Sequence, residues 1–569
     1  MGFFTRRDEG LPLADQFEQQ VLVMDGSMRD ALAAQGLPPS ESPELVNVDR
    51  PEIIADIHRA YVDAGAGIIR TNTFAASAPA LARFGAESRM REINAAAVKA
   101  ARIAGARHIY GAIGPTGLSI APYGPIPFDE AYRVFRDQIE ALADAGIEGI
   151  IVENMVDLQE ARVAILAALE TAAKPVACTF AFGDGGRMPV SETDPLGAAV
   201  TIAGMGVSHL GPGQGVDPVH VAQLLELMGR ASAVPLICLV DAGREDVLLS
   251  QLDACVEAGA GIVGTSGGAV ALTRTIAERV TGKVPPRRRR SRATLLCSRK
   301  RLVPIHPDAG TVMIGERINA ANSPRLAEFL RGGDLTVAVE EAKQQVAAGA
   351  HVLDINVSID EVDEAKMLAE TIGAVQAEVE VPLSINTASP RSLDRALRVY
   401  CGKALVNFVS AKDGSLARML PVVKKYGAAV IGLTLDEQGI PATVFDKVDL
   451  AKLMLDACED AGIAPNDLVM DCIVIGAAEN QEQVREALDA VRQVSKKMEL
   501  NTTLRIASVS HGMPNRFVLN RAFLAMGLAA GLDSAIVDPL EPGMAETFAA
   551  SDVLLGRDKG AAAFKQRFG

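Results

Sequence analysis

The chain has 569 residues, of which 49% are hydrophobic and 22% charged, and its formal net charge is −15. At roughly 100–200 residues per domain, or about 250 for an α/β barrel, this length predicts two large domains. The apolar content excludes a disordered chain, and no apolar run approaches the roughly 18 residues of a membrane span. Seven scattered cysteines argue against a disulfide framework, and residues 1–10 turn charged too early for a signal peptide. We therefore expect a cytoplasmic protein without membrane contacts.

A basic segment interrupts an otherwise acidic chain. Residues 283–301 contain nine Lys or Arg and no Asp or Glu, so the remainder carries a charge of −24. An acidic body repels nucleic acid, and we expect no nucleic-acid partner. The Pro285-Pro286 pair and the lack of apolar periodicity predict a solvated basic linker over 283–304. The alternative is a basic patch for an acidic partner or a phosphate-bearing ligand.

Both sides of this segment repeat a short apolar run, a turn and an Ala-rich amphipathic helix. The runs lie at 21–26, 67–74, 109–117, 149–154, 175–182, 207–213, 235–243 and 261–268, and then at 312–319, 351–357, 382–389, 404–410, 429–436, 468–476, 504–512 and 534–539. Continuous apolar runs are typical of parallel strands buried on both faces, and eight βα units close a barrel. We therefore predict an α/β fold with two tandem (β/α)8 TIM barrels, over residues 1–282 and 305–569. An open doubly wound sheet is the alternative, but no GxGxxG motif follows the first run.

Polar residues stand at the ends of these runs, where barrel enzymes place their active sites. The first half offers Asp25, Thr71, Asn72, Glu153 and Asn154, and the second offers Glu316, Asn319, Asp354, Asn356, Asn386, Asn407, Asp471, Ser508 and Asp538. Any one of them could be a turn residue, but the second set should converge on one barrel mouth. Its amides and carboxylates suit a neutral heterocycle with alternating donors and acceptors, such as a pterin, and not a phosphate.

Long stretches of the sequence resemble the two N-terminal modules of the cobalamin-dependent methionine synthase family. MDG at 24–26, residues 51–74 and AIGPTG at 112–117 are similar to its homocysteine S-methyltransferase barrel, whereas IGERIN at 314–319 and residues 342–357 and 402–414 are similar to its methyltetrahydrofolate-binding barrel. Residues 509–539 resemble stand-alone methyltetrahydrofolate:corrinoid methyltransferases more closely. The resemblance implies a methyltransferase that uses tetrahydrofolate or 5-methyltetrahydrofolate. No Asp-x-His-x-x-Gly cobalamin motif follows, so we expect a separate corrinoid protein as partner.

The resemblance also implies a zinc site that this sequence does not retain. The family holds zinc with three cysteines after the sixth and eighth strands, whereas the corresponding stretches 204–213 and 264–270 contain none. Ser208 and Ser266 stand near the expected positions, but hydroxyls are poor zinc ligands beside thiolates. We therefore expect no zinc in the first barrel and interpret His209 as a turn residue.

In the second barrel, the resemblance assigns the pterin contacts to strand-end residues. By motif these are Asp354, Asn356, Asn386, Asn407 and Asp471, and Glu316 and Asn319 complete the expected cofactor site. The family's mobile Asn, which assists at N5 of the pterin, corresponds to Ser508. Methyl transfer from a tertiary amine needs N5 protonated or hydrogen-bonded. We therefore expect Asn386, Asp471 and Ser508 to be the catalytic residues.

Together these observations predict a corrinoid-linked, tetrahydrofolate-dependent methyltransferase. The first barrel would act on a different small-molecule methyl donor or acceptor, held by Asp25, Asn72 and Glu153. Arg70 stands where the family has a glutamate, which indicates either an anionic ligand or a surface-facing change. One alternative is a split N-terminal part of a methionine synthase with an altered zinc site. The other is a non-catalytic folate-binding or scaffold protein, and a homodimer is compatible with either.

Overall fold

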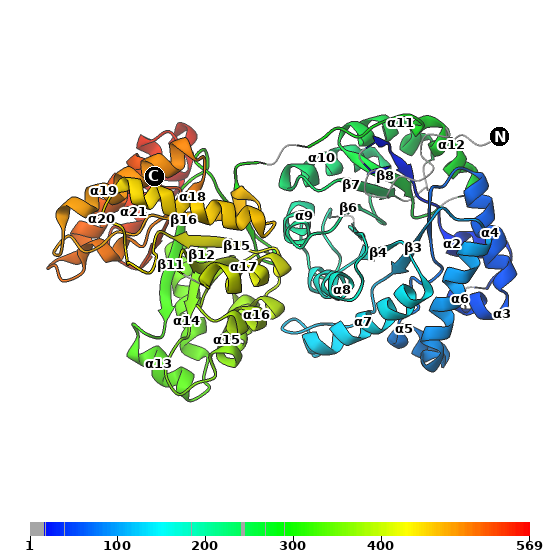
Figure 1. Cartoon of the computed structure of the whole chain (residues 1–569), viewed down its shortest axis with the longest axis horizontal. Coiled ribbons are helices and arrows are strands. Elements are labelled where there is room, and N and C mark those ends of the chain that lie inside the picture. Colours follow the sequence, from blue (N-terminus) through cyan, green and yellow to red (C-terminus); the bar gives the residue numbers. More distant parts are fainter. Residues whose placement is uncertain are drawn as a thin grey trace. The chain divides into compact units, whose positions relative to one another are not determined.

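The computed structural model of the chain describes residues 16–569, except 18, 39, 184, 241–244, 268, 289–290 and 413. The chain divides into two compact units, Met1–Arg290 and Ser291–Gly569. Each unit is a ring of parallel strands surrounded by helices (Figure 1). The two predicted tandem barrels are therefore confirmed. Residues 1–10, from which we argued against a signal peptide, and two arginines of the basic segment lie outside the described residues.

The first barrel contains eight parallel strands in which neighbours in the chain are neighbours in space. They are β1 (Leu22–Val23), β2 (Ile68–Arg70), β3 (His108–Ile113), β4 (Gly149–Met155), β5 (Val176–Phe180), β6 (His209–Pro212), β7 (Leu236–Val240) and β8 (Ala260–Thr265). A bridge between Met24 and Ile68 joins β1 to β2 and closes the ring. The helices are α2 (Met28–Ala34), α3 (Val46–Asp49), α4 (Pro51–Asp63), α5 (Ala78–Leu81), α6 (Met90–Ile103), α7 (Phe128–Ala145), α8 (Leu158–Thr171), α9 (Pro195–Gly204), α10 (Val221–Ala231), α11 (Glu245–Glu257) and α12 (Val270–Val280).

Apolar residues fill the interior of this barrel. Tyr110, Ile151 and Ile237, from β3, β4 and β7, belong to one fully buried cluster inside the ring. The outer faces of the same strands pack under the helices, so the strands are apolar on both faces, as their continuous runs indicated. The polar side chains that remain are therefore concentrated at the ends of the strands.

The second barrel repeats this architecture. Its strands are β11 (Val312–Asn319), β12 (Val352–Asn356), β13 (Leu383–Asn386), β14 (Leu405–Ser410), β15 (Ala429–Leu433), β16 (Leu468–Asp471), β17 (Asn501–Thr503) and β18 (Ser534–Val537). All neighbours are parallel, and a bridge between Arg505 and Ile536 joins the last two strands. The helices are α13 (Pro324–Arg331), α14 (Thr336–Ala348), α15 (Glu364–Glu378), α16 (Pro390–Val399), α17 (Ser415–Tyr426), α18 (Val444–Asp460), α19 (Gln481–Lys497), α20 (Arg516–Ala530), α21 (Met544–Leu554) and α22 (Ala562–Phe568).

The seventh strand of this barrel lies earlier than expected. The run 504–512 predicted a strand, but β17 ends at Thr503 and residues Ile506–Ser510 form a short 3-10 helix, η6. The strand consists of Asn501, Thr502 and Thr503, which are polar but fully enclosed. Two of these residues are β-branched and favour a strand, yet they lack the apolar character that the pattern relied on.

The predicted linker is shorter than expected, because its second part belongs to the second barrel. Residues Thr294–Cys297 (β9) and Leu302–Ile305 (β10) form an antiparallel hairpin. Leu296 and Ile305 are fully buried in the core of the second barrel. The backbone of Cys297 exchanges two hydrogen bonds, of 3.0 and 2.8 Å, with that of Lys403, just before β14. The sequence analysis missed this hairpin, because its alternating apolar residues lie among many arginines. The hairpin covers the end of the barrel opposite its mouth.

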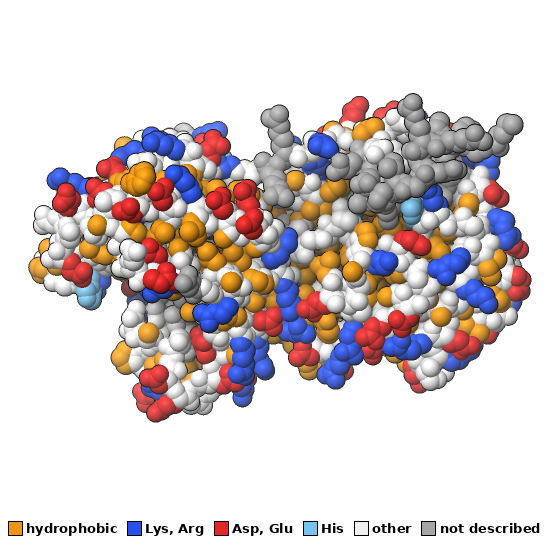
Figure 2. Space-filling model, viewed as in Figure 1, with side chains coloured by type: hydrophobic (Ala, Val, Ile, Leu, Met, Phe, Trp, Pro, Cys, Tyr) orange, Lys and Arg blue, Asp and Glu red, His pale blue; other side chains and the backbone are white. Residues whose placement is uncertain are grey.

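The surface carries charges of both signs. On the face drawn in Figure 2, Asp and Glu side chains lie interspersed with Lys and Arg. Among the described residues, none of the helices is long and apolar enough to cross a membrane. All seven cysteines are buried and free, in agreement with the absence of a disulfide framework.

Candidate functional site

The carboxylate of Asp354 organises the polar side chains at the mouth of the second barrel. It accepts hydrogen bonds from Ser384 Oγ (2.6 Å), Asn386 Nδ2 (2.8 Å) and Asn407 Nδ2 (2.9 Å). Asn356 Nδ2 in turn donates to Asn386 Oδ1 at 3.2 Å. Strands β12, β13 and β14 thus bring four of the predicted pterin residues into one network. Buried groups that are hydrogen-bonded in this way hold one orientation and present a defined pattern of donors and acceptors.

Two further predicted residues, Glu316 and Asp471, face a residue that was not predicted. Arg505 follows β17, and its Nε donates to Glu316 Oε2 at 2.7 Å. Burial lowers the pKa of Arg505, but the charges of Glu316, Asp354 and Asp471 outweigh burial and raise it. Burial raises the pKa of Glu316, and it raises that of Asp471 to about 6. Acids of β11, β12 and β16 therefore act on one guanidinium at this mouth.

The remaining predicted residues of the second barrel make no hydrogen bond to the Asp354 network and contact residues near them instead. Asn319 Oδ1 accepts from the N–H of Ala321 at 3.1 Å, which is a turn contact. Asp538 pairs with Arg317 Nη1 at 2.9 Å. Ser508 lies in η6, half-buried, and its N–H donates to the carbonyl of Arg505. The structure thus places Ser508 next to Arg505, whereas Asn319 has the simpler role of closing a turn.

Sequence reasoning missed both Arg505 and Lys447. Lys447 of α18 is buried, and its Nζ donates to the carbonyls of Cys472 and Ile473 at 3.0 Å each. Burial lowers the pKa of Lys447, and this lysine holds the turn in which the N–H of Ile473 donates to Asp471 Oδ1 at 2.8 Å. Arg505 was detectable as a charged residue after a strand, but it was included in the run 504–512. Nothing in the sequence distinguished Lys447 from surface lysines.

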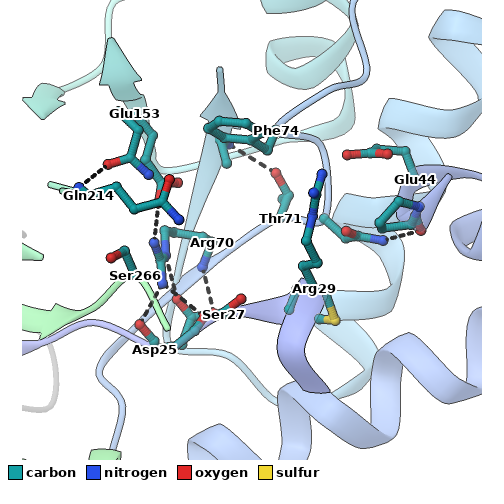
Figure 3. Close-up of a pocket in the computed structure, with 16 residues that line it drawn as sticks. Asp25, Ser27, Arg29, Glu44, Arg70, Thr71, Phe74, Glu153, Gln214 and Ser266 are labelled. Atoms are coloured by element: carbon teal, nitrogen blue, oxygen red, sulfur yellow. Dashed lines mark hydrogen bonds and ion pairs between the residues drawn. The ribbon is translucent and has the colours of Figure 1, made fainter. Parts of the chain in front are cut away.

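The mouth of the first barrel encloses a cavity of about 200 Å³ (Figure 3). Arg70 fills its floor: Nε donates to Asp25 Oδ1 at 2.9 Å, and Nη1 pairs with Glu153. Its Nη2 lies within 2.7–2.9 Å of the carbonyls of Asp25, Gly26 and Thr265. The side chain is 7% exposed. Arg70 is therefore neither surface-facing nor free for an anionic ligand, because the protein already neutralises it.

The three predicted substrate residues of this barrel all line the cavity, but their side chains have partners within the protein. Asp25 and Glu153 hold Arg70. Burial raises the pKa of Asp25 to about 6, against the lowering effect of Arg70, so the carboxylate is ionised at neutral pH. Asn72 Nδ2 donates to the carbonyl of Pro43 at 2.6 Å and to Asn47 Oδ1 at 2.9 Å. Ser266 differs, because its buried Oγ has no partner among the described residues.

Among the described residues of the first barrel, those expected near the zinc position do not supply zinc ligands. Ser208 precedes β6, and its Oγ donates to the carbonyl of Val176, the first residue of β5. His209 begins β6, and its ring packs against Phe17 at 4.3 Å, where burial lowers its pKa to about 3. Both residues therefore lie at the end of the barrel opposite the mouth, which corrects their predicted positions.

Gln214 and Ser266 are the residues that line the cavity after β6 and β8. An amide and a hydroxyl provide no thiolate for zinc. Throughout the described part of the chain, no three His, Cys, Asp or Glu side chains form a group that could hold a metal ion.

Comparison with known families agrees with this division into two sites. Residues 22–268 match the family model described as homocysteine S-methyltransferase, and residues 315–538 match that of the pterin binding enzymes. The chain joins an S-methyltransferase domain to a pterin-binding domain. Each match lies within one barrel and reaches all eight of its strands, and neither includes the hairpin between them.

Relatives of known name cover both domains. The methionine synthases of Mycobacterium tuberculosis and Mycobacterium leprae are each 28% identical to the chain over 92% of its length. The chain spans about half of these relatives, 48% in both cases. Crystal structures of the Escherichia coli homocysteine methyltransferase MmuM align with 47% of the chain at 22% identity, with a TM-score of 0.43 for the oxidised form and 0.42 for the metallated form.

Proposed function

We propose that the chain is a folate-linked methyltransferase, whose pterin-binding domain exchanges a methyl group between 5-methyltetrahydrofolate and a separate corrinoid protein. The S-methyltransferase domain would act on a second small-molecule methyl donor or acceptor. The proposal draws on the two family matches and on relatives that are named methionine synthase.

The observation that carries the proposal is the network around Asp354. A pterin ring presents N–H donors beside ring-nitrogen and carbonyl acceptors, so its recognition needs carboxylates and oriented amides in one place. Asp354 orients Asn386 and Asn407 through their amide nitrogens. The Asp471 carboxylate accepts a hydrogen bond from the backbone N–H of Ile473 at 2.8 Å, and a backbone hydrogen bond from Arg505 also acts on it. An ionised carboxylate has about four lone-pair sites, so Asp471 can accept a pterin N–H in addition to these backbone groups.

The chemical step needs a donor near N5 of the pterin. When the methyl–N5 bond breaks, its electron pair stays on N5, and a proton or hydrogen bond there stabilises the leaving amine. We propose that Asn386, Asp471 and Ser508 take part in this step, with Ser508 in the position of the family's mobile Asn. The methyl acceptor would be the reduced cobalt of the corrinoid.

A separate corrinoid protein would serve both domains. Barrel interiors are packed cores, so no tunnel leads from one active site to the other, and methyl transfer needs reacting atoms about 3–3.5 Å apart. A carrier that visits each mouth satisfies this requirement. The test is methyl transfer from 5-methyltetrahydrofolate to free cob(I)alamin, measured by the absorbance of methylcobalamin. Binding without transfer would favour the non-catalytic folate-binding protein instead.

The second candidate is a split part of a methionine synthase, which the names of the relatives favour. Formation of methionine from homocysteine, in the presence of a corrinoid protein, would identify it. The first domain is then tested by comparing the whole chain with residues 291–569, which include the hairpin that belongs to the second unit. If this fragment completes the full cycle alone, the two-site shuttle is wrong.

A further inference from the structure

We propose that Arg505 binds the folate ligand directly and selects a pterin with an acceptor at position 4. Its second terminal nitrogen would donate a hydrogen bond to the 4-oxo group, a role that no strand-end residue of the prediction supplied. The proposal rests on the function proposed for the second domain, because it names the residue that recognises one edge of the same ligand.

Arg505 occupies the right part of the fold for this role. It follows β17 at the mouth, and its guanidinium reaches Glu316 on β11, with Nε to Oε2 at 2.7 Å. The charges of Asp354 on β12 and Asp471 on β16 act on it as well. Residues from strands on either side of β17 thus surround one guanidinium, which places it among the groups proposed to bind the pterin.

One nitrogen of Arg505 lacks a partner. Nη2 is buried, yet it makes no hydrogen bond with any described residue. Buried charged donors are nearly always satisfied in folded proteins, and an exception at a proposed binding site indicates a contact that the ligand completes. The side chain as a whole is 37% exposed, so the guanidinium borders the open mouth, and Nη2 lies covered at its inner side.

The surrounding charges specify the kind of ligand. Glu316, Asp354 and Asp471 are acceptors when ionised, whereas the guanidinium is purely a donor. A 4-oxo pterin carries N–H donors on its pyrimidine ring and an acceptor at the oxo group, so it can satisfy both types. A 4-amino analogue replaces that acceptor with a donor, which would face the Nη2 hydrogens and leave both sides unpaired. Sites that hydrogen-bond a specific group reject analogues that lack it, often by orders of magnitude.

Calorimetric titration of the full-length chain with 5-methyltetrahydrofolate and with its 4-amino analogue tests the proposal. We expect the wild type to prefer the 4-oxo ligand by at least about tenfold. Arg505→Gln should weaken binding of the 4-oxo ligand about tenfold and remove most of the preference. Arg505→Lys keeps a charge for Glu316 but has no second nitrogen, so it should also lose the preference while the fold is retained.

The matched control is Arg492→Gln, on the exposed surface of α19, which should leave both affinities unchanged. A merely structural role for Arg505 would lower both affinities together and leave their ratio intact, and that result would overturn the proposal. It would also be overturned if Arg505→Lys kept the wild-type preference. A wild-type chain that binds neither ligand would refute the proposed function of the domain itself, which is a distinguishable outcome.

Discussion

Each barrel places an arginine between carboxylates at its mouth, but the two arginines differ in how many of their nitrogens have hydrogen-bond partners within the protein. Arg70 is 7% exposed, and all three of its nitrogens have partners within the first barrel. Arg505 is 37% exposed, bonds through Nε, and has an unpartnered Nη2. A saturated arginine builds the floor of a site, whereas an arginine with a free donor is available to a ligand. Arg70 thus has a structural role, and Arg505 is the arginine that we propose binds a ligand.

The same contrast extends to the acids. In the first barrel, Asp25 and Glu153 are used to neutralise Arg70, so the open polar groups of the cavity include Ser266. In the second barrel, Asp354 orients neutral amides, and the Asp471 carboxylate accepts from backbone N–H groups and is not paired with a side chain in the way that Asp25 and Glu153 are. The first mouth is therefore largely satisfied by its own residues, and the second is prepared for an external donor and acceptor pattern.

Removing Arg70 should have the largest effect. Arg70→Met leaves two buried carboxylates without a counter-charge, and breaking such a buried pair costs about 3–5 kcal/mol. We expect the free energy of unfolding of the first unit to fall by that amount in denaturant titrations. Arg505→Met is the matched comparison and should destabilise the second unit less, because its side chain is partly solvated. Equal losses would remove the distinction between the two arginines.

The end of the second barrel opposite its mouth offers the next test. Leu296→Ala removes a fully buried side chain of the hairpin, and such changes cost about 2–5 kcal/mol. The neighbouring Leu295 is only partly buried, so Leu295→Ala should cost clearly less. Chemical unfolding of the two variants measures the difference. A hairpin that acted as a solvated linker would tolerate both changes equally.

Asp471→Ala should weaken the binding of 5-methyltetrahydrofolate tenfold or more. A hydrogen bond to a charged group is worth about 1.5–3 kcal/mol, and about 1.4 kcal/mol corresponds to a factor of ten in Kd. Asp456→Ala, on the exposed face of α18, is the control and should bind normally. Calorimetry on both variants decides the matter, and unchanged affinity in the first would exclude Asp471 from the site.

The pH dependence of binding should follow the same carboxylate. Burial raises the pKa of Asp471 to about 6, so the group is largely protonated at pH 5 and ionised at pH 7. Because the ionised form accepts the pterin N–H, affinity should rise as the pH increases through about 6. In Asp471→Asn this rise should disappear, since the amide does not titrate. A rise that persists in the variant would point to another group, such as Glu316.

The smallest effect concerns zinc. The first mouth offers Gln214 and Ser266 in place of thiolates, so we expect metal analysis to find no stoichiometric zinc. Treatment with a chelator should leave the unfolding temperature of the first unit unchanged. The expectation is wrong if metal analysis finds about one zinc per chain and if this zinc is lost in Ser266→Ala. Activation of a thiol substrate by zinc would then again be a candidate function of the first barrel.

The positions predicted for Ser208 and His209 show where sequence reasoning failed. A short apolar run does not reveal which of its residues begins the strand, and β6 begins at His209. The two residues were expected at the mouth but lie at the opposite end. For the same reason, the seventh strand of the second barrel was predicted at 504–512, whereas it ends at Thr503. Arg505 was therefore assigned to the strand and was not recognised as a residue of the mouth.

The sequence by itself determined the two barrels and the polar character of their mouths. Strands buried on both faces are mostly continuous apolar runs, so the repeat was visible without coordinates, and polar residues are concentrated at strand ends, with β17 as the exception. The tertiary structure decided which of these residues meet. Arg70 and Arg505 are both single arginines beside strands, and only the arrangement of neighbouring strands satisfies one and leaves the other open. Hydrogen bonding between distant segments depends on the register of the strands, which local patterns do not encode.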